Sequence, residues 1–193
     1  MPTKLNFPTA HLKFVSKNRL GIRRKQVRLN LLRFVYRYRL AESFEGLIAP
    51  DVGRTRLGYD VITKIFLANT AYELIVKTAV MLNIPSVRAL EENGVTNEDV
   101  AIKIRANDIL REFLLNYPSH KQEMLIKLRL FFSESTSDIS CVSYALRNIF
   151  AHGDLTSTAI GMEKKERREV LLDLADAMLD YCDELFTKCV NQL

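Results

Sequence analysis

The sequence predicts an all-α protein, an up-and-down helical bundle with a long first and a long last helix. Apolar residues recur at spacings of three and four over long stretches, which is typical of helices that bury one face. Only 7 Gly and 5 Pro interrupt the 193 residues, so the turns between helices are few. Residues 1–193 are therefore expected to form a single helical domain with a basic N-terminal arm and helix over residues 1–41.

Caps and periodicity together give the expected helices. The first fifteen residues contain Pro2 and Pro8 and are expected to be irregular. Thr96, Ser119 and Asp138 are the expected N-caps of three later helices. The predicted helices span residues 22–48, 59–83, 86–92, 97–116, 119–132, 139–152 and 163–191. In the first of them the expected buried stripe is Leu29, Leu32, Tyr36, Leu40 and Phe44.

Charge is unevenly distributed along the chain. Residues 1–41 hold eleven of the 28 Lys and Arg residues and none of the 23 Asp and Glu residues, so the remainder is net acidic. A basic arm of this kind indicates a polyanion partner or an acidic protein partner. Docking of the arm on its own acidic body, or on a second copy, explains the pattern equally well.

Several classes of site are absent from the sequence. It contains no phosphate-binding glycine loop, no dinucleotide-binding glycine pattern and no nucleophile elbow. The 3 His and 3 Cys residues lack zinc spacing, so no metal or cofactor is expected. An acidic stripe on the last helix is interpreted as a solvated face rather than a magnesium site; it comprises Asp173, Asp176, Asp180 and Asp183. Without a signal peptide or an uncharged apolar span, a cytoplasmic protein with no membrane partner is expected.

The most informative segment runs from Arg147 to Gly153 at the end of one predicted helix. Projected at about 100° per residue, Asn148 and His152 are neighbours away from the apolar side, and Arg147 lies on the other flank. The core side of the helix is expected to contain Ile139, Val142, Leu146, Ile149 and Phe150. None of the three polar residues therefore has the position of a core residue.

This set of side chains suits RNA cleavage without a metal. Arg matches phosphate oxygens, His moves a proton near neutral pH, and Asn holds a phosphate oxygen or orients the imidazole. The predicted catalytic residues are Arg147, His152 and the supporting Asn148. A helix C-cap explains the same pattern, because a cation and a His before Gly complement the helix dipole.

The pattern R-N-x-x-x-H-G at the end of a bundle helix resembles the R-x(4–6)-H signature of the HEPN superfamily. The resemblance covers Arg147, Asn148 and His152, the bundle plan and the chain length. It implies a homodimer that joins two motifs in one cleft and cleaves RNA without metal, in a toxin–antitoxin or antiviral-defence role with an antitoxin or defence protein as partner. One subgroup carries Tyr two residues after the His, where this chain has Asp154. Some members lack catalysis, so a non-catalytic nucleic-acid- or protein-binding module remains the alternative.

If RNA is the partner, the arm supplies phosphate contacts. The predicted RNA-binding residues are Arg23, Arg24, Lys25, Arg28, Arg33, Arg37 and Arg39. Tyr36 and Tyr38 have the chemistry to stack on bases, or they belong to the core or to a dimer contact. For Tyr36 we expect the latter, because it falls on the predicted apolar stripe.

Overall fold

The computed structural model describes residues 7–21, 24–48, 55–85, 94–118, 121–156 and 158–193. Their secondary structure is helical, with one isolated β-bridge between Thr96 and Asp138. The described helices are α1 (His11–Leu20), α2 (Lys25–Glu42), α3 (Thr55–Met81), α5 (Glu98–Arg105), α6 (Asp108–Asn116), α7 (Gln122–Phe132), α8 (Ile139–Ala151) and α9 (Lys165–Asn191). The predicted all-α bundle is confirmed. Among the described residues, no helix combines the length and the apolar character needed to cross a bilayer.

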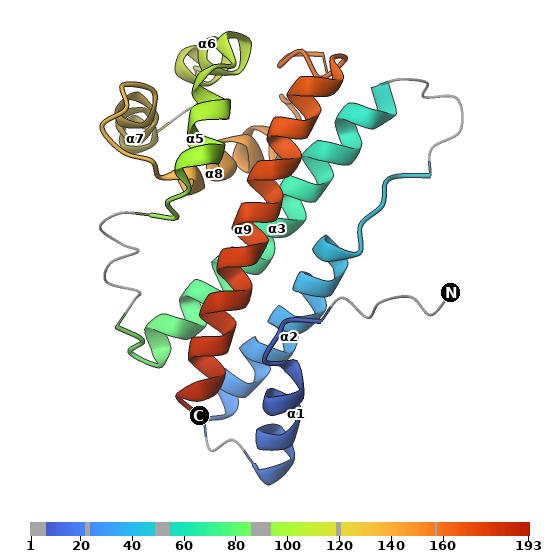
Figure 1. Cartoon of the computed structure of the whole chain (residues 1–193), viewed down its shortest axis with the longest axis vertical. Coiled ribbons are helices and arrows are strands. Elements are labelled where there is room, and N and C mark those ends of the chain that lie inside the picture. Colours follow the sequence, from blue (N-terminus) through green and yellow to red (C-terminus); the bar gives the residue numbers. More distant parts are fainter. Residues whose placement is uncertain (1–6, 22–23, 49–54, 86–93, 119–120, 157) are drawn as a thin grey trace.

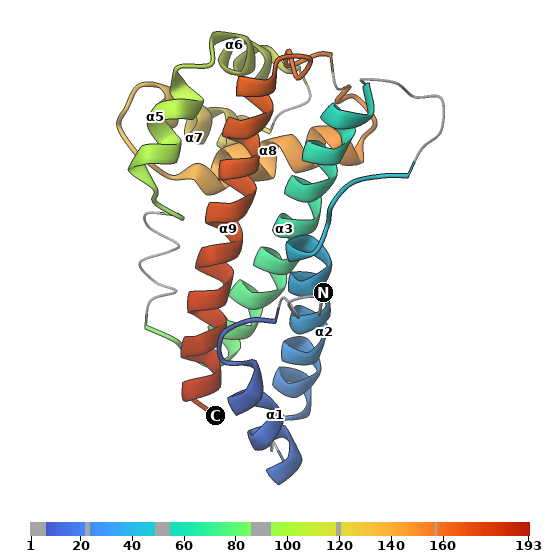
Figure 2. The same cartoon turned by 45° about the vertical axis from the view of Figure 1, so that its right-hand side comes forward.

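Three long helices, α2, α3 and α9, form the body of the bundle (Figure 1). α2 runs antiparallel to α3, since Arg37 of α2 bonds Thr70 and the earlier Arg24 bonds the later Met81. α3 and α9 run in the same direction, because α5 to α8 form a lobe that returns the chain to the end where α3 began (Figures 1 and 2). α8 lies across α3 within this lobe. The C-terminal end of α8, which carries Arg147, Asn148 and His152, is therefore held by the bundle.

The predicted leading helix over residues 22–48 is wrong in its bounds. The chain instead forms α1, which falls partly in the segment expected to be irregular, and then α2, which ends at Glu42. Phe14 of α1 is buried against Phe186 of α9 at a ring distance of 5.7 Å, and the ring of Phe186 also stacks on that of Phe34. The tertiary burial of Phe14 therefore stabilises a helix that its own sequence only weakly favours.

The predicted buried stripe of α2 is also wrong. Tyr36 is 68% exposed and Leu40 is 55% exposed, and Leu29, Leu32 and Phe44 are only partly buried. The face packed on α3 and α9 contains Val27, Asn30, Leu31, Phe34, Val35, Tyr38 and Ala41. Because α2 carries apolar residues on two faces, its period alone does not say which one is covered.

Two predicted caps differ from those observed. Asn97, rather than Thr96, caps α5 by accepting a hydrogen bond from the Val100 N–H at 3.1 Å. The helix expected over residues 97–116 ends at Arg105, because Asn107 caps a new helix, α6, through the Leu110 N–H. The predicted helix at residues 86–92 and the predicted Ser119 cap lie outside the described residues.

Candidate functional site

The candidate site is the C-terminal end of α8, and local sequence signals set both ends of that helix. At its start, the Asp138 carboxylate accepts hydrogen bonds from the N–H groups of Ser140 at 2.9 Å and Val95 at 3.0 Å. The predicted N-cap is thus confirmed. The apolar side faces the core as expected, with Ile139, Val142, Leu146 and Ile149 buried and Phe150 partly buried.

A buried polar contact sets how α8 meets α3. Asn69 and Ser143 are each fully buried, and the Asn69 Nδ2 donates to the Ser143 Oγ. The same Nδ2 also donates to the Ile65 carbonyl at 3.2 Å. Hydrogen bonding between buried partners resists sliding of one helix along the other, so this pair fixes the position of Arg147 one turn further along α8.

The guanidinium of Arg147 is held on the surface of α3 with part of its bonding capacity unused. Its Nη1 donates to the Asn148 Oδ1 at 2.8 Å, and its Nη2 lies 3.5 Å from the Glu73 Oε2. Its Nε is buried and has no hydrogen-bond partner among the described residues. The group lies 5.9 Å from the Phe66 ring centre and 6.0 Å from that of Tyr144. Arg147 is therefore a cation held in place by Asn148 and α3, with its buried Nε left without a partner among the described residues.

His152 lies at the C-cap of α8 and is exposed. The Gly153 N–H donates to the Phe150 carbonyl at 2.9 Å, and the Asp154 N–H donates to the Ile149 carbonyl at 3.1 Å. These two bonds are a Schellman motif, and Gly153 has the positive φ of 82° that the motif requires. The predicted C-cap glycine is confirmed, while the imidazole makes no hydrogen bond or ion pair with another described residue.

The structure brings the Arg147 and Asn148 side chains into contact, and the His152 N–H donates to the Asn148 carbonyl at 3.1 Å, but the imidazole bonds neither side chain. Five residues along a helix correspond to a rotation of about 140° and an advance of about 7.5 Å. The side chains of Arg147 and His152 thus leave α8 in different directions. Next to His152, the Asp154 carboxylate accepts a hydrogen bond from the Tyr117 hydroxyl, which ties this loop to the end of α6.

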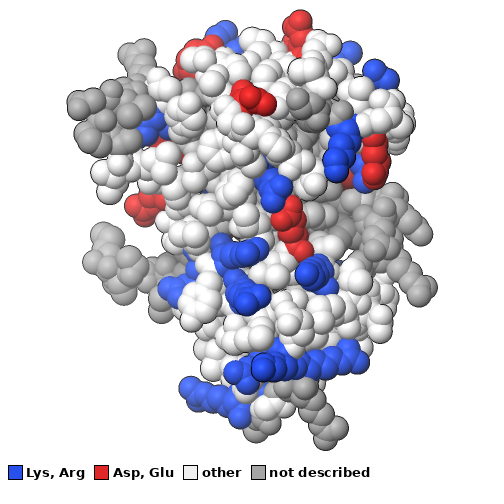
Figure 3. All heavy atoms as spheres, turned by 180° about the vertical axis from the view of Figure 1, so that it is seen from behind, with Lys and Arg blue, Asp and Glu red and all other residues white. Residues whose placement is uncertain are grey.

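The predicted RNA-binding residues do not form one continuous row. Lys25, Arg28 and Arg33 are exposed. Arg24 and Arg37 are exposed but donate to the carbonyls of Met81 at 3.1 Å and Thr70 at 2.9 Å. Arg39 lies 4.0 Å above the Phe7 ring, and Arg23 is outside the described residues. Figure 3 shows Lys and Arg gathered over the lower half of the face opposite to that of Figure 1.

The start of the basic arm docks on α9 of its own chain. The Thr9 N–H donates to the Asp183 Oδ1 at 2.7 Å, and Lys13 and Lys17 bond the last residues of α9. Two other carboxylates of the acidic stripe form ion pairs, Asp173 with Lys103 and Asp176 with Lys64, each at 2.6 Å. Within the described part of the chain, no group of three His, Cys, Asp or Glu residues is placed to hold a metal ion.

Sequence reasoning missed the residues that surround Arg147. Glu73 and Phe66 come from α3, and Tyr144, which is 40% exposed, comes from α8 itself. Glu73 is one of few charged residues in an apolar stretch, which was the only local signal that it has a special position.

Comparisons of the chain with protein-family models, with curated proteins and with solved structures find no match. The chemistry assigned to Arg147, Asn148 and His152 therefore depends on their residue types and on the geometry described above.

Proposed function

We propose that the protein is a metal-independent endoribonuclease of HEPN type that acts as a homodimer in a toxin or antiviral-defence role. The observation that best supports this proposal is the state of Arg147. Its guanidinium is fixed beside Asn148, yet its one carboxylate contact is long, at 3.5 Å, and its Nε has no partner within the described chain. A cation used only for stability is expected to have its donors satisfied.

The proposed reaction is transesterification within RNA. The 2′-oxygen attacks the adjacent phosphorus, a new P–O2′ bond forms, and the P–O5′ bond breaks. His152 transfers a proton at the attacking or the leaving oxygen, and Arg147 stabilises the negative charge of the pentavalent phosphorus. The products are a 2′,3′-cyclic phosphate and a 5′-hydroxyl.

The spacing of the two residues supports the proposed homodimer. Because Arg147 and His152 leave α8 about 140° apart, one helix does not direct both at the same phosphate. Two copies of α8 placed side by side bring the Arg147 of one chain near the His152 of the other. The exposed Tyr144 and the exposed apolar residues of α2, Tyr36 and Leu40, are available for such a contact.

The test is incubation of the purified protein with a mixed RNA pool in EDTA, followed by analysis of product ends. We expect wild-type protein to leave 5′-hydroxyl and cyclic-phosphate ends. We expect His152→Ala to lower the cleavage rate about 100-fold or more, with an unchanged melting temperature because the ring is exposed. Arg147→Lys keeps the charge but loses the planar fork, and we expect it to be impaired as well.

Lys164→Ala is the matched control, since Lys164 is exposed just before α9 and its side chain makes no cap hydrogen bond. It is expected to cleave at the wild-type rate. Full activity of His152→Ala, or products with 5′-phosphate ends, would contradict the proposal.

The second candidate is a non-catalytic helical module that binds nucleic acid or an acidic protein. The Schellman motif favours it, because the end of α8 would place His152 and Gly153 as they are for structural reasons alone. This second candidate predicts that binding to nucleic acid or to the acidic protein weakens as salt increases, and that no cleavage products form. Deletion of residues 1–41 does not test it, because α2 belongs to the core. Replacing the exposed Arg28 and Arg33 by Gln is the suitable variant.

A further inference from the structure

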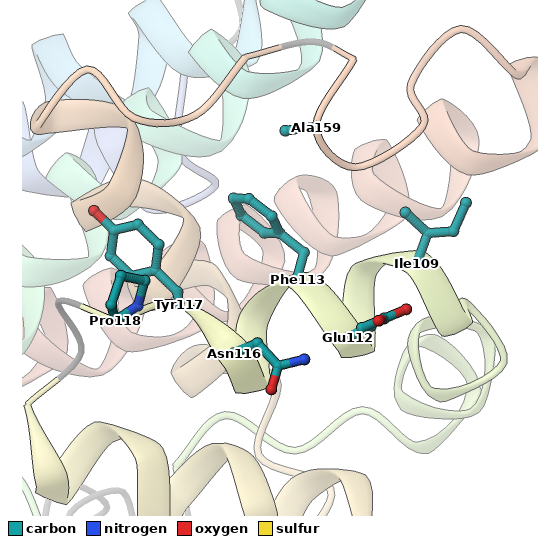
Figure 4. Close-up of a pocket in the computed structure, with 7 residues that line it drawn as sticks. All are labelled: Ile109, Glu112, Phe113, Asn116, Tyr117, Pro118 and Ala159. Carbon is teal, nitrogen blue, oxygen red and sulfur yellow. The ribbon is translucent and has the colours of Figure 1, made fainter.

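A pocket of about 360 Å³ lies between α6 and the loop that precedes α9. Figure 4 shows the ring of Phe113 pointing from α6 toward the loop segment that carries Ala159, with the ring of Tyr117 just after the end of the helix. The two ring centres are 6.2 Å apart and their planes differ by 36°. The pocket is thus an open site of small-molecule size with two aromatic rings along one wall.

The pocket adjoins the proposed catalytic segment. The Tyr117 hydroxyl donates to a carboxylate oxygen of Asp154, so the aromatic wall is connected directly to the loop after α8. Asp154 follows His152 by two residues, a backbone reach of at most about 7 Å. The pocket therefore lies beside the loop that follows His152.

The rim of the pocket is polar and acidic. Glu112 and Asn116 both line it, and they are four residues apart on α6, so they share one exposed side of the helix (Figure 4). A carboxylate accepts hydrogen bonds through two oxygens and donates none. It therefore favours a ring that presents two adjacent N–H donors.

We propose that this pocket binds one unpaired guanine base of single-stranded RNA. Guanine stacks on aromatic rings through its flat face, and its Watson–Crick edge presents the N1–H and the N2 amino group side by side to the Glu112 carboxylate. Adenine and uracil present an acceptor where one of these donors is required. The inference rests on the proposed function, since that function supplies single-stranded RNA as the ligand, and it makes cleavage selective for sites next to guanine.

The experiment measures binding of fluorescent uridine hexamers that carry a single guanine or a single adenine, by anisotropy in EDTA. His152→Ala serves as the background so that the RNA stays intact. We expect the guanine hexamer to bind about tenfold more tightly than the adenine hexamer. In the same background, Glu112→Gln is expected to reduce that preference to less than about twofold, and Phe113→Leu to weaken binding of the guanine hexamer about tenfold through lost stacking.

Glu123→Gln is the matched control, because it removes the same charge from the neighbouring helix α7, where Glu123 is 84% exposed and outside the pocket. It is expected to keep the guanine preference. Equal binding of the two hexamers, or a preference that survives Glu112→Gln, overturns the inference, as does the absence of any RNA binding. A guanine preference without cleavage by wild-type protein supports the pocket and refutes the ribonuclease. Cleavage by wild-type protein without a guanine preference supports the ribonuclease and refutes the pocket.

Discussion

Asn69 and Ser143 form the one contact between fully buried polar side chains that joins α3 to α8 within the described chain. Both residues have no exposed surface, so the energy of their hydrogen bond is not reduced by competition with water. The Asn69 Oδ1 has no hydrogen-bond partner among the described residues, which makes the Nδ2 bonds the side chain's only compensation for burial. The pair therefore contributes more to the position of α8 than to the total stability.

We predict that Ser143→Ala lowers the free energy of unfolding by about 1–3 kcal/mol, because it removes an acceptor from a buried amide. The melting temperature should fall by about 3–10 °C. The double variant Asn69→Leu with Ser143→Ala should recover much of this loss, since both polar groups are then removed together. Thermal unfolding followed by circular dichroism measures the melting temperatures of the wild-type protein and of both variants.

Ser135→Ala is the control at an exposed serine, and its melting temperature should change little. A Ser143→Ala variant as stable as wild type would show that the buried hydrogen bond does not hold α8 in place.

At the scale of the helix, α8 depends on a glycine at each end. Gly94 lies beside the N-cap, and a Cβ added there would stand 1.9 Å from the Asp138 carboxyl carbon. At the other end, Gly153 has a φ of 82° and open space around it. Gly94 is required both for this close approach and for its own positive φ of 67°, whereas Gly153 is required for backbone conformation alone.

We predict that Gly153→Ala destabilises the protein by about 1 kcal/mol, since an L side chain disfavours the left-handed region even where space is free. That corresponds to a fall of about 2–4 °C in melting temperature. Gly153→Asn should lose less, because Asn tolerates this conformation. A calorimetric scan of both variants measures the difference, and an Ala variant equal to or above wild type would rule out a cap that depends on Gly153.

At the scale of the whole molecule, carboxylates of α2 and α9 gather where these helices meet. Partial burial raises the pKa of Asp180 above its usual range, and the charges of Asp176 and Asp183 raise it further. Burial likewise raises the pKa of Glu42, with Lys64 opposing and the same three carboxylates adding. Such groups bind protons more tightly in the folded state, so their contribution to stability is favourable in acid and is lost as pH rises through the raised pKa.

We therefore predict that Asp180→Asn raises the melting temperature at pH 7 by about 1–2 °C, because it removes a partly buried charge and its repulsion with Asp176 and Asp183. Below the ordinary carboxyl pKa, near pH 3.5, the variant and wild type should melt at the same temperature. Glu166→Gln is the control, because it removes a charge from the first turn of α9, where a negative charge is favourable. An equal increase in the melting temperature of Asp180→Asn at pH 7 and at pH 3.5 would contradict the electrostatic explanation.

The sequence by itself determined α8, the core side of that helix and the polar residues at its end. Asp138, Gly153 and the apolar period act over one or two turns, and local signals of this kind need no tertiary partner. The helical character of α3 and α9 was predicted for the same reason. The charge asymmetry was also evident, but the sequence left open whether the arm met its own body or another molecule.

Only the tertiary structure decided what is set by contacts distant in sequence. It chose between the two apolar faces of α2, exposing Tyr36 and burying Tyr38. It placed Glu73 beside Arg147, and it docked Thr9 on Asp183 although 174 residues separate them. Periodicity says that a helix has an apolar face, while the partner that covers that face depends on how all the helices pack together.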